Sequence, residues 1–421
     1  MYVQQEALFP FESFVKNVDE DDRIFVALSS IDVQPIMTLF PDKRLGRPGF
    51  SRVALFRALV LQKILHLPSV EALVTCLRYS PQFLHWCGFD YRRDRPSATV
   101  FYRFQDQLAR KSGHELLDKL AVGILQRLAP FASSHGMIIL DSTDIPAREA
   151  PPKRKKGSDK DEESEKVSPL GSAFGHRTAS EEETEIFYGY KYHAACVLTD
   201  LGIIPLAGRM VPANVSDMDL GVASWLMQEA CCQHEALFGF VPPYYVEDAG
   251  YDRTELYKLA LELDGQAIIK MNKRNQKQPP IGFTKKGTPL CPGGRPMAYW
   301  GADGKHQTIK FRCPKAVGQK VDCQHECNCH TAYGLITRLH IPDNLRLFNS
   351  PHRDSDKWRK IYSHRSSIER WFSVLKEHLA LADMTRRGIQ KSFVDVIITI
   401  ITFLAGTLAQ AQINNRRQKA A

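Results

Sequence analysis

The sequence lacks the features of an exported or membrane-spanning protein. Its first residues, MYVQQEALFPFESF, do not place a basic segment before an apolar core, so we expect no signal peptide. The most apolar stretch, Val394 to Ala409, is shorter than the roughly 20 residues of a membrane span and contains Asp395. We therefore predict a cytoplasmic protein with no membrane partner, in which this stretch is a buried helix and the ten cysteines stay reduced.

Acidic residues are scarce in one long segment. From Lys270 to Lys320 there are twelve Lys or Arg residues and a single acid, Asp303, although the net charge of the whole chain is only +9. Such a local excess of positive charge is typical of proteins that bind a polyanion. The sequence therefore predicts contact with nucleic acid, while charge alone says nothing about the fold.

Apolar patterns predict a helical region followed by an α/β core with a mixed sheet. Between Phe50 and Leu108 apolar residues recur at helical spacing, with Ser51, Ser69 and Ser97 at the expected helix starts. Five short apolar runs follow and predict strands, among them MIILD, a hairpin that turns at Asp200, YYVED and QAIIK. Helical segments between or after these runs complete an α/β pattern.

The same patterns divide the chain into four parts. The predicted parts are a helical DNA-binding or dimerisation region, 1–130; the first part of the core, 131–272, with a charged disordered loop at 151–185; a basic, cysteine-containing and β-rich insertion, 273–349; and the C-terminal helices of the core, 350–421.

Three acids occupy positions where chemistry is expected. Asp141 and Asp248 each end a predicted strand, and Glu369 lies on a helix after the insertion. Carboxylates at strand ends can bind hard divalent cations, and two such ions can drive phosphodiester chemistry. Two neighbouring acids, Asp144 and Glu247, are rivals for these places. The alternative is that strand-end aspartates merely cap turns.

The basic surroundings of Glu369 make it more specific. Arg365 and Lys376 lie four residues before it and seven residues after it, so the three side chains share one helical face. A metal-binding glutamate beside cations that follow phosphates suits chemistry on a DNA backbone. The alternative is an ordinary Arg–Glu pair on a solvated helix.

This spacing is also a family signature. Tyr362, Arg365, Glu369 and Lys376 fit the pattern Y-x2-R-x3-E-x6-K, which resembles the signature of bacterial DDE transposases of the insertion-sequence-four type. The resemblance extends to IILDSTDI, GYKYHAACVLTDLGIIPLA, PANVSD and VEDAGYD. The N-terminal GFSRVALFRALVLQKIL and SATVFYRF resemble the helical region common in the insertion-sequence-five type.

The resemblance implies a fold and an activity. It implies an RNase H-like catalytic core in which Asp141, Asp248 and Glu369 hold two Mg²⁺ or Mn²⁺ ions, while the DNA-binding residues are Tyr362, Arg365, Arg370 and Lys376. Such an enzyme hydrolyses DNA at the terminal inverted repeats of its element and joins the freed ends to target DNA, as a homodimer in the bacterial cytoplasm, at the nucleoid. The alternatives are an RNase H-like nuclease or domesticated derivative without strand transfer, and a non-catalytic zinc-containing DNA-binding protein.

The insertion also contains a group of cysteines. Cys313, Cys323, Cys327 and Cys329 are candidate ligands of a structural zinc ion, because thiolates in such a cluster can close a tetrahedral site. The sequence has no regular pair of C-x2-C knuckles, so the alternative of scattered reduced cysteines stays open.

Overall fold

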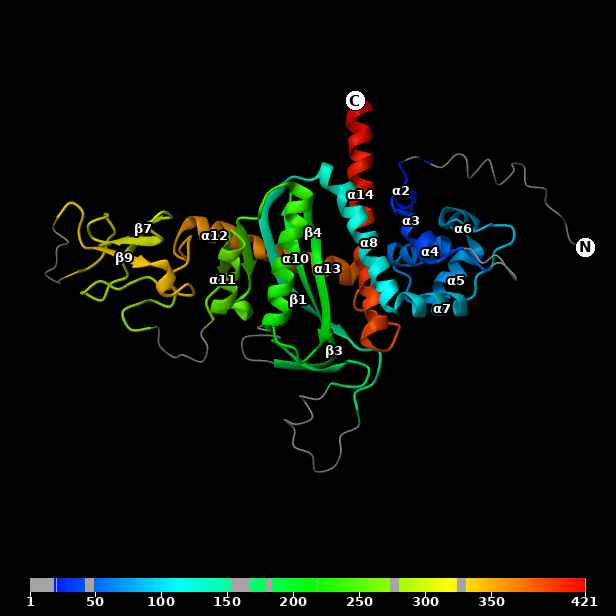
Figure 1. Ribbon diagram of the computed structural model, residues 1–421, viewed down its shortest axis with the longest axis horizontal. Coiled ribbons are helices and arrows are strands. Elements are labelled where there is room, and N and C mark those ends of the chain that lie inside the picture. Colours follow the sequence, from blue (N-terminus) through cyan, green and yellow to red (C-terminus); the bar gives the residue numbers. More distant parts are fainter. Residues whose placement is uncertain are drawn as a thin grey trace, which may run out of the picture.

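The protein is elongated, with a mixed sheet between a helical region and a small second sheet (Figure 1). The computed structural model describes residues 19, 21–41, 49–152, 167–178, 184–217, 219–272, 280–323 and 331–420. The helical region contains α2 (Arg23–Ser29), α3 (Gln34–Leu39), α4 (Arg52–Ile64), α5 (Val70–Tyr79), α6 (Pro81–Cys87), α7 (Ala98–Leu108), α8 (Lys111–Leu128) and the 3₁₀ turn η1 (Ala129–Phe131).

The starts of these helices follow the local chemistry of the sequence. The side chains of Ser51 and Ser69 accept hydrogen bonds from the first-turn amides of Ala54 and Ala72, as expected for N-caps. Ser97 also precedes a helix, but its side chain makes no capping hydrogen bond. The helix starts predicted from the sequence at these three serines are therefore correct.

The central sheet is mixed and, within the described residues, six-stranded. Its strands are β1 (Ser134–Pro146), β2 (Ala173–Thr178), β3 (Thr184–Thr199), β4 (Gly202–Pro212), β5 (Tyr244–Glu247) and β6 (Gln266–Ile269). β3 pairs antiparallel with β1, β2 and β4, whereas β1, β5 and β6 run parallel to one another. The mixed sheet with helices on both sides is consistent with an RNase H-like core (Figure 1).

Strand β2 corrects one expectation from the sequence. Part of the predicted disordered loop, 151–185, forms this strand, which pairs with the first half of β3. Ala173 to His176 lack the dense charge of the tract before them, and the ring of Phe174 packs at a tilt of 55° against that of Tyr188 across the pair, with ring centroids 5.0 Å apart. The charged residues 153–166 lie outside the described residues.

Helices cover the sheet and bury its apolar strands. They are α10 (Leu220–Phe238), the 3₁₀ turn η2 (Ala249–Tyr251), α11 (Thr254–Glu262), α12 (Asp356–Tyr362), the 3₁₀ turn η5 (Ser363–Arg365), α13 (Ser366–His378) and α14 (Ile389–Ala420). α10 packs against β1, β3 and β4, and α13 packs against β1 and β4. Ile138, Ile139 and Leu140 are fully buried as a result, which explains their continuous apolar run.

The insertion forms a small sheet with a core of its own. Its strands are β7 (Ala298–Asp303), β8 (Thr308–Arg312) and β9 (Ile336–His340), followed by the 3₁₀ turn η4 (Ile341–Asp343). Ile309 and Phe311 of β8 are completely buried and pack with Met297, Leu347 and Phe348. A separate cluster of apolar side chains lets this sheet stand apart from the central one (Figure 1).

Helix α14 joins the helical region to the core. It packs against α2, α4 and α8 on one side and against β4 and α13 on another. By length and composition it could cross a membrane, but 78% of its most apolar 18-residue window is buried within the protein. The predicted buried helix is therefore present, and it extends well beyond the apolar run at both ends.

Shortening a buried side chain of α14 should destabilise the whole protein. Leu404 is 1% exposed, so Leu404→Ala leaves a cavity and is expected to lower the free energy of unfolding by about 2–5 kcal/mol. Asn414→Ala, on an exposed part of the same helix, is the control and should change it by less than about 0.5 kcal/mol. Urea unfolding followed by circular dichroism measures both, and equal effects would contradict the packing role of α14.

Candidate active site

Asp141 lies where β1 passes the end of its parallel neighbour. The apolar run predicts that β1 ends at Asp141, but the strand continues to Pro146 because it stays paired with β3. Its pairing with β5 stops at Leu140, opposite Glu247. Asp141 is thus the first residue of β1 beyond the end of β5, on an edge left open to other groups.

Asp248 lies at the same edge, directly after β5. It caps the η2 turn, and its Oδ1 accepts a hydrogen bond from the amide of Ala249 at 2.6 Å. Because β1 and β5 are parallel neighbours whose last partners are Leu140 and Glu247, Asp141 and Asp248 are the next residue of each chain segment where this pairing stops. The negative charge of Asp248 accordingly acts on Asp141 and raises its pKa.

Glu369 reaches this edge on a segment of three short elements rather than one helix. Tyr362 ends α12, Arg365 ends η5, and Glu369 lies in the first turn of α13. The expected pair of Arg365 and Glu369 is present, with Nη2 and Oε1 2.5 Å apart. The break between the helices turns Arg365 inward, so that it is 20% exposed while Glu369 remains 52% exposed.

Arg365 connects the acids of the two strands with that of the helix. Its Nη1 lies 3.5 Å from Asp141 Oδ2, while its Nη2 holds Glu369. Burial opposes the charged form of Arg365, but the charges of Asp248, Glu369 and Asp141 outweigh burial and raise its pKa. Two acids far apart in the sequence therefore contact one guanidinium, and a third, Asp248, acts on it through its charge.

Asp141 is in an environment that disfavours its charge. Burial raises its pKa to about 7, and the negative charges of Asp248 and Asp217 act in the same direction. Arg365 and a hydrogen bond from the Ser142 amide to Asp141 Oδ1, at 2.8 Å, act in the opposite direction. The carboxylate is thus poorly neutralised by the protein and would gain from a bound cation.

The two rival acids, Asp144 and Glu247, lie in other surroundings than Asp141 and Asp248. Adjacent strand residues point to opposite faces, so Asp144, three residues after Asp141, is on the other face of β1, opposite Lys191 of β3. Glu247 is completely buried, and neither of its carboxylate oxygens hydrogen-bonds to another described residue. Burial raises the pKa of Glu247 to about 8, as expected for an isolated interior carboxyl.

Asp217 is a further acid beside the site that the sequence analysis gave no role. Its Oδ1 accepts a hydrogen bond from Ser142 Oγ at 2.8 Å and lies 3.4 Å from Lys191 Nζ. Asp217 also lies against the η2 turn, because a Cβ atom added at Gly250 would lie 3.5 Å from the Cβ of Asp217. The only signal in the sequence was its place in PANVSD, which carries no chemistry without the fold.

The remaining predicted DNA-binding residues lie on the same segment. Tyr362 is near the acids, because burial and then the charges of Asp248, Asp141 and Glu369 raise its pKa to about 12. Tyr362 stacks on Trp358, with ring centroids 4.6 Å apart and planes 11° from parallel. Arg370 is exposed and donates to the hydroxyls of Ser366 and Ser367 at 3.1 and 2.9 Å. Lys376 is half-buried near the end of α13. Of the four, only Arg365 contacts the acids through a described salt bridge.

The zinc prediction stays a prediction. Cys313 is buried and Cys323 half-buried, both with free thiols, whereas Cys327 and Cys329 lie outside the described residues. In the part of the chain that the structure describes, no three His, Cys, Asp or Glu side chains are close enough to hold a metal ion as they stand. At the acid cluster, the guanidinium of Arg365 separates Asp141 from Glu369.

Two family models match the chain. Residues 132–404 match the family described as "Transposase DDE domain", and residues 11–107 match "Transposase domain (DUF772)". No curated protein matches the chain. The first match spans more than half of the sequence and includes Asp141, Asp248 and Glu369. The chain therefore belongs to the DDE transposases of bacterial insertion sequences, a family of enzymes that act on DNA.

Proposed function

We propose that this transposase hydrolyses phosphodiester bonds at the ends of its element and transfers the freed 3′-ends to target DNA, with Asp141, Asp248 and Glu369 as its metal ligands. The observation that carries the proposal is that Arg365 contacts both Asp141, at 3.5 Å, and Glu369, at 2.5 Å, while Asp248 follows the strand that pairs with β1 up to Leu140. An aspartate that only caps a turn and a glutamate that only lies on a solvated helix would have no reason to contact the same guanidinium.

The donor set fits a hard divalent cation such as Mg²⁺ or Mn²⁺. Carboxylate oxygens are the ligands that such ions prefer, and three are supplied here by separate segments. The pKa of Asp141 is raised first by burial and then by the charges of Asp248 and Asp217, and a bound cation would stabilise the ionised carboxylate there. Two bound ions would supply activation of the attacking oxygen and stabilisation of the leaving oxygen.

Arg365 would have two alternative partners in this proposal. In the free protein its guanidinium neutralises the acids, and in the DNA complex a phosphate can replace them, because Arg binds carboxylates and phosphates with similar geometry. Its departure would expose the carboxylate oxygens to the metal ions. DNA binding and metal binding would thus favour each other.

Positive side chains on α13 and on the insertion would contact the DNA backbone. Arg370 and Lys376 lie on the same segment as Arg365. The insertion adds exposed lysines, which are Lys285, Lys286, Lys305, Lys315 and Lys320. Such contacts bind DNA of any sequence. Recognition of the terminal inverted repeats would therefore come mainly from other residues, in the N-terminal helices. We expect two copies of the chain to bring the two ends together.

The first prediction concerns the three acids. Asp141→Asn, Asp248→Asn and Glu369→Gln should each abolish Mg²⁺-dependent cleavage of an element end, because each removes a charged oxygen ligand, while binding to that end stays largely intact. Gel assays of cleavage and binding measure the two effects. Glu377→Gln, an exposed acid on the same helix, is the matched control and should cleave normally.

Full Mg²⁺-dependent cleavage by the Glu369→Gln protein would overturn the ligand assignment. The same assay distinguishes a nuclease from a transposase in the wild-type protein. A nuclease would release the element end but give no product joined to target DNA.

The second prediction concerns Arg365. Arg365→Ala removes the cation that competes for the acids, so the DNA-free protein should bind Mn²⁺ several-fold more tightly, as measured by the electron paramagnetic resonance signal of the free ion. Arg370→Ala is the control, because that guanidinium bonds to serine hydroxyls instead. Equal Mn²⁺ affinities in the two variants would contradict the competition.

The third prediction concerns salt. Phosphate contacts release counterions, so log affinity should fall linearly with log salt concentration, by about 0.9 for each neutralised phosphate. Lys376→Ala should weaken binding to all duplexes similarly and reduce the slope by roughly one. An unchanged slope with a selective loss of end recognition would contradict a backbone role for this residue.

A further inference from the structure

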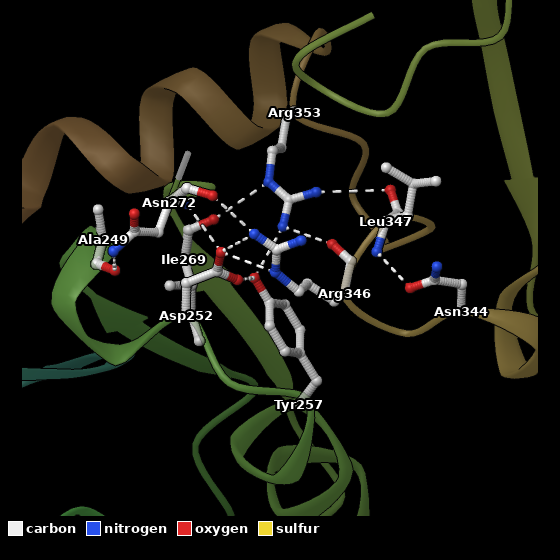
Figure 2. A network of polar contacts seen from close by, with 9 residues as sticks. All are labelled: Ala249, Asp252, Tyr257, Ile269, Asn272, Asn344, Arg346, Leu347 and Arg353. Carbon is white, nitrogen blue, oxygen red and sulfur yellow. Dashed lines mark hydrogen bonds and ion pairs between the residues drawn. The ribbon is translucent and has the colours of Figure 1, made fainter. Parts of the chain in front are cut away.

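A buried polar network joins the insertion to the turn that carries Asp248. The chain leaves the core at Asn272, after β6, and returns through Arg346 and Arg353, ahead of α12. Figure 2 shows side chains from both passages meeting at Asp252. Asp252 lies four residues after Asp248 and is completely buried.

The carboxylate of Asp252 is held on both of its oxygens. Oδ2 accepts hydrogen bonds from Arg346 Nε at 2.8 Å and from the amide of Asn272 at 2.7 Å, and Arg346 Nη2 also lies 2.7 Å from it. Oδ1 accepts from the hydroxyl of Tyr257 at 3.0 Å. Charge-assisted bonds in a buried place fix a side chain tightly, since losing one partner leaves the other charge unpaired.

A second arginine holds this arrangement from behind. Arg353 is 3% exposed and donates through Nη2 to the Tyr257 hydroxyl at 2.7 Å and to the carbonyl of Arg346 at 2.8 Å. Its Nε donates to the carbonyl of Ile269, the last residue of β6, at 3.1 Å. The network therefore rests on the central sheet as well as on the insertion (Figure 2).

The same network holds the backbone just after Asp248. The carbonyl of Ala249 accepts from the side-chain amide of Asn272 at 3.2 Å and from the backbone amide of Asp252 at 3.3 Å. The carbonyl of Asp248 accepts from the amide of Tyr251 at 3.0 Å. The η2 turn is thus fixed by β5 on one side and by Asp252 with Asn272 on the other.

We propose that Asp252 is a positioning residue for Asp248, which holds the η2 turn so that the Asp248 carboxylate faces Asp141, and that Arg346 makes this position depend on the docking of the insertion. The inference rests on the proposed role of Asp248 as a metal ligand. Residues that hold metal ligands in place typically change metal affinity or activity by about 10- to 100-fold when they are replaced.

A purely structural role for Asp252 would be to anchor the insertion, and the chain offers a control for that role. Asp354 also anchors the insertion, through Lys286 Nζ at 3.0 Å and the hydroxyl of Thr288. These described contacts of Asp354 are with the insertion and not with the η2 turn. Replacing either acid is expected to lower the stability of the protein, but only replacing Asp252 is expected to lower its affinity for the metal ion.

The test compares Asp252→Asn with Asp354→Asn in the full-length protein. Asn removes the negative charge that Arg346 pairs with and replaces one of the two acceptor oxygens with an N–H group, so the turn should loosen. We expect Asp252→Asn to weaken Mn²⁺ binding by about 10-fold, and to raise by a similar factor the Mg²⁺ concentration for half-maximal cleavage, while saturating Mg²⁺ restores the rate. Asp354→Asn should lower the melting temperature but leave unchanged the affinity for Mn²⁺ and the Mg²⁺ concentration for half-maximal cleavage.

Equal shifts of Mn²⁺ affinity in the two variants, or no shift in Asp252→Asn, would overturn the inference. Asn272→Ala is the milder variant if Asp252→Asn does not fold, because the backbone amide still binds Asp252. It should weaken Mn²⁺ binding by a few-fold, and an unchanged affinity would count equally against the inference. Asp248→Asn in the same titration tests the ligand itself, and unchanged Mn²⁺ binding there would overturn the proposed function instead.

Discussion

The candidate site depends on the point where the parallel pairing of β1 and β5 stops. Leu140 and Glu247 are the last partners, and the next residue of each strand is a proposed ligand, Asp141 or Asp248. β1 needs β3 to continue past this point, because an unpaired strand end would fray and let Asp141 turn away. The pairing of β1 with β5 therefore ends at the candidate site, while the pairing of β1 with β3 continues and keeps this part of β1 in place.

The site combines negative charge with limited access to water. Burial and neighbouring acids both disfavour the ionised form of Asp141, and the guanidinium of Arg365 acts against them. A lysine could not serve two carboxylates with the same planar geometry. Asp217 adds a further negative charge next to β1, which Lys191 partly balances from the neighbouring strand. The electrostatic balance of the site thus involves more residues than the three proposed ligands.

The sequence predicted features that depend on local chemistry better than those that depend on distant partners. Serine caps, apolar strands and the buried α14 follow from neighbouring residues, and Arg365 with Glu369 from helical spacing. The extension of β1 past Asp141 was not predicted because pairing with β3, and not apolar content, decides where the strand ends. Asp217 and Asp252 were missed for a similar reason, since their partners lie far away in the sequence.

Helix α14 has a consequence for the order in which the protein can fold. Its buried face completes the packing of α2, α4 and α8, which precede the core in the chain, whereas α14 follows the core. At about 5–20 residues per second, the N-terminal helices wait on the order of tens of seconds for their final partner. Until then the apolar surface that these helices share with α14 is not covered by it, so their final packing waits until the core has been made.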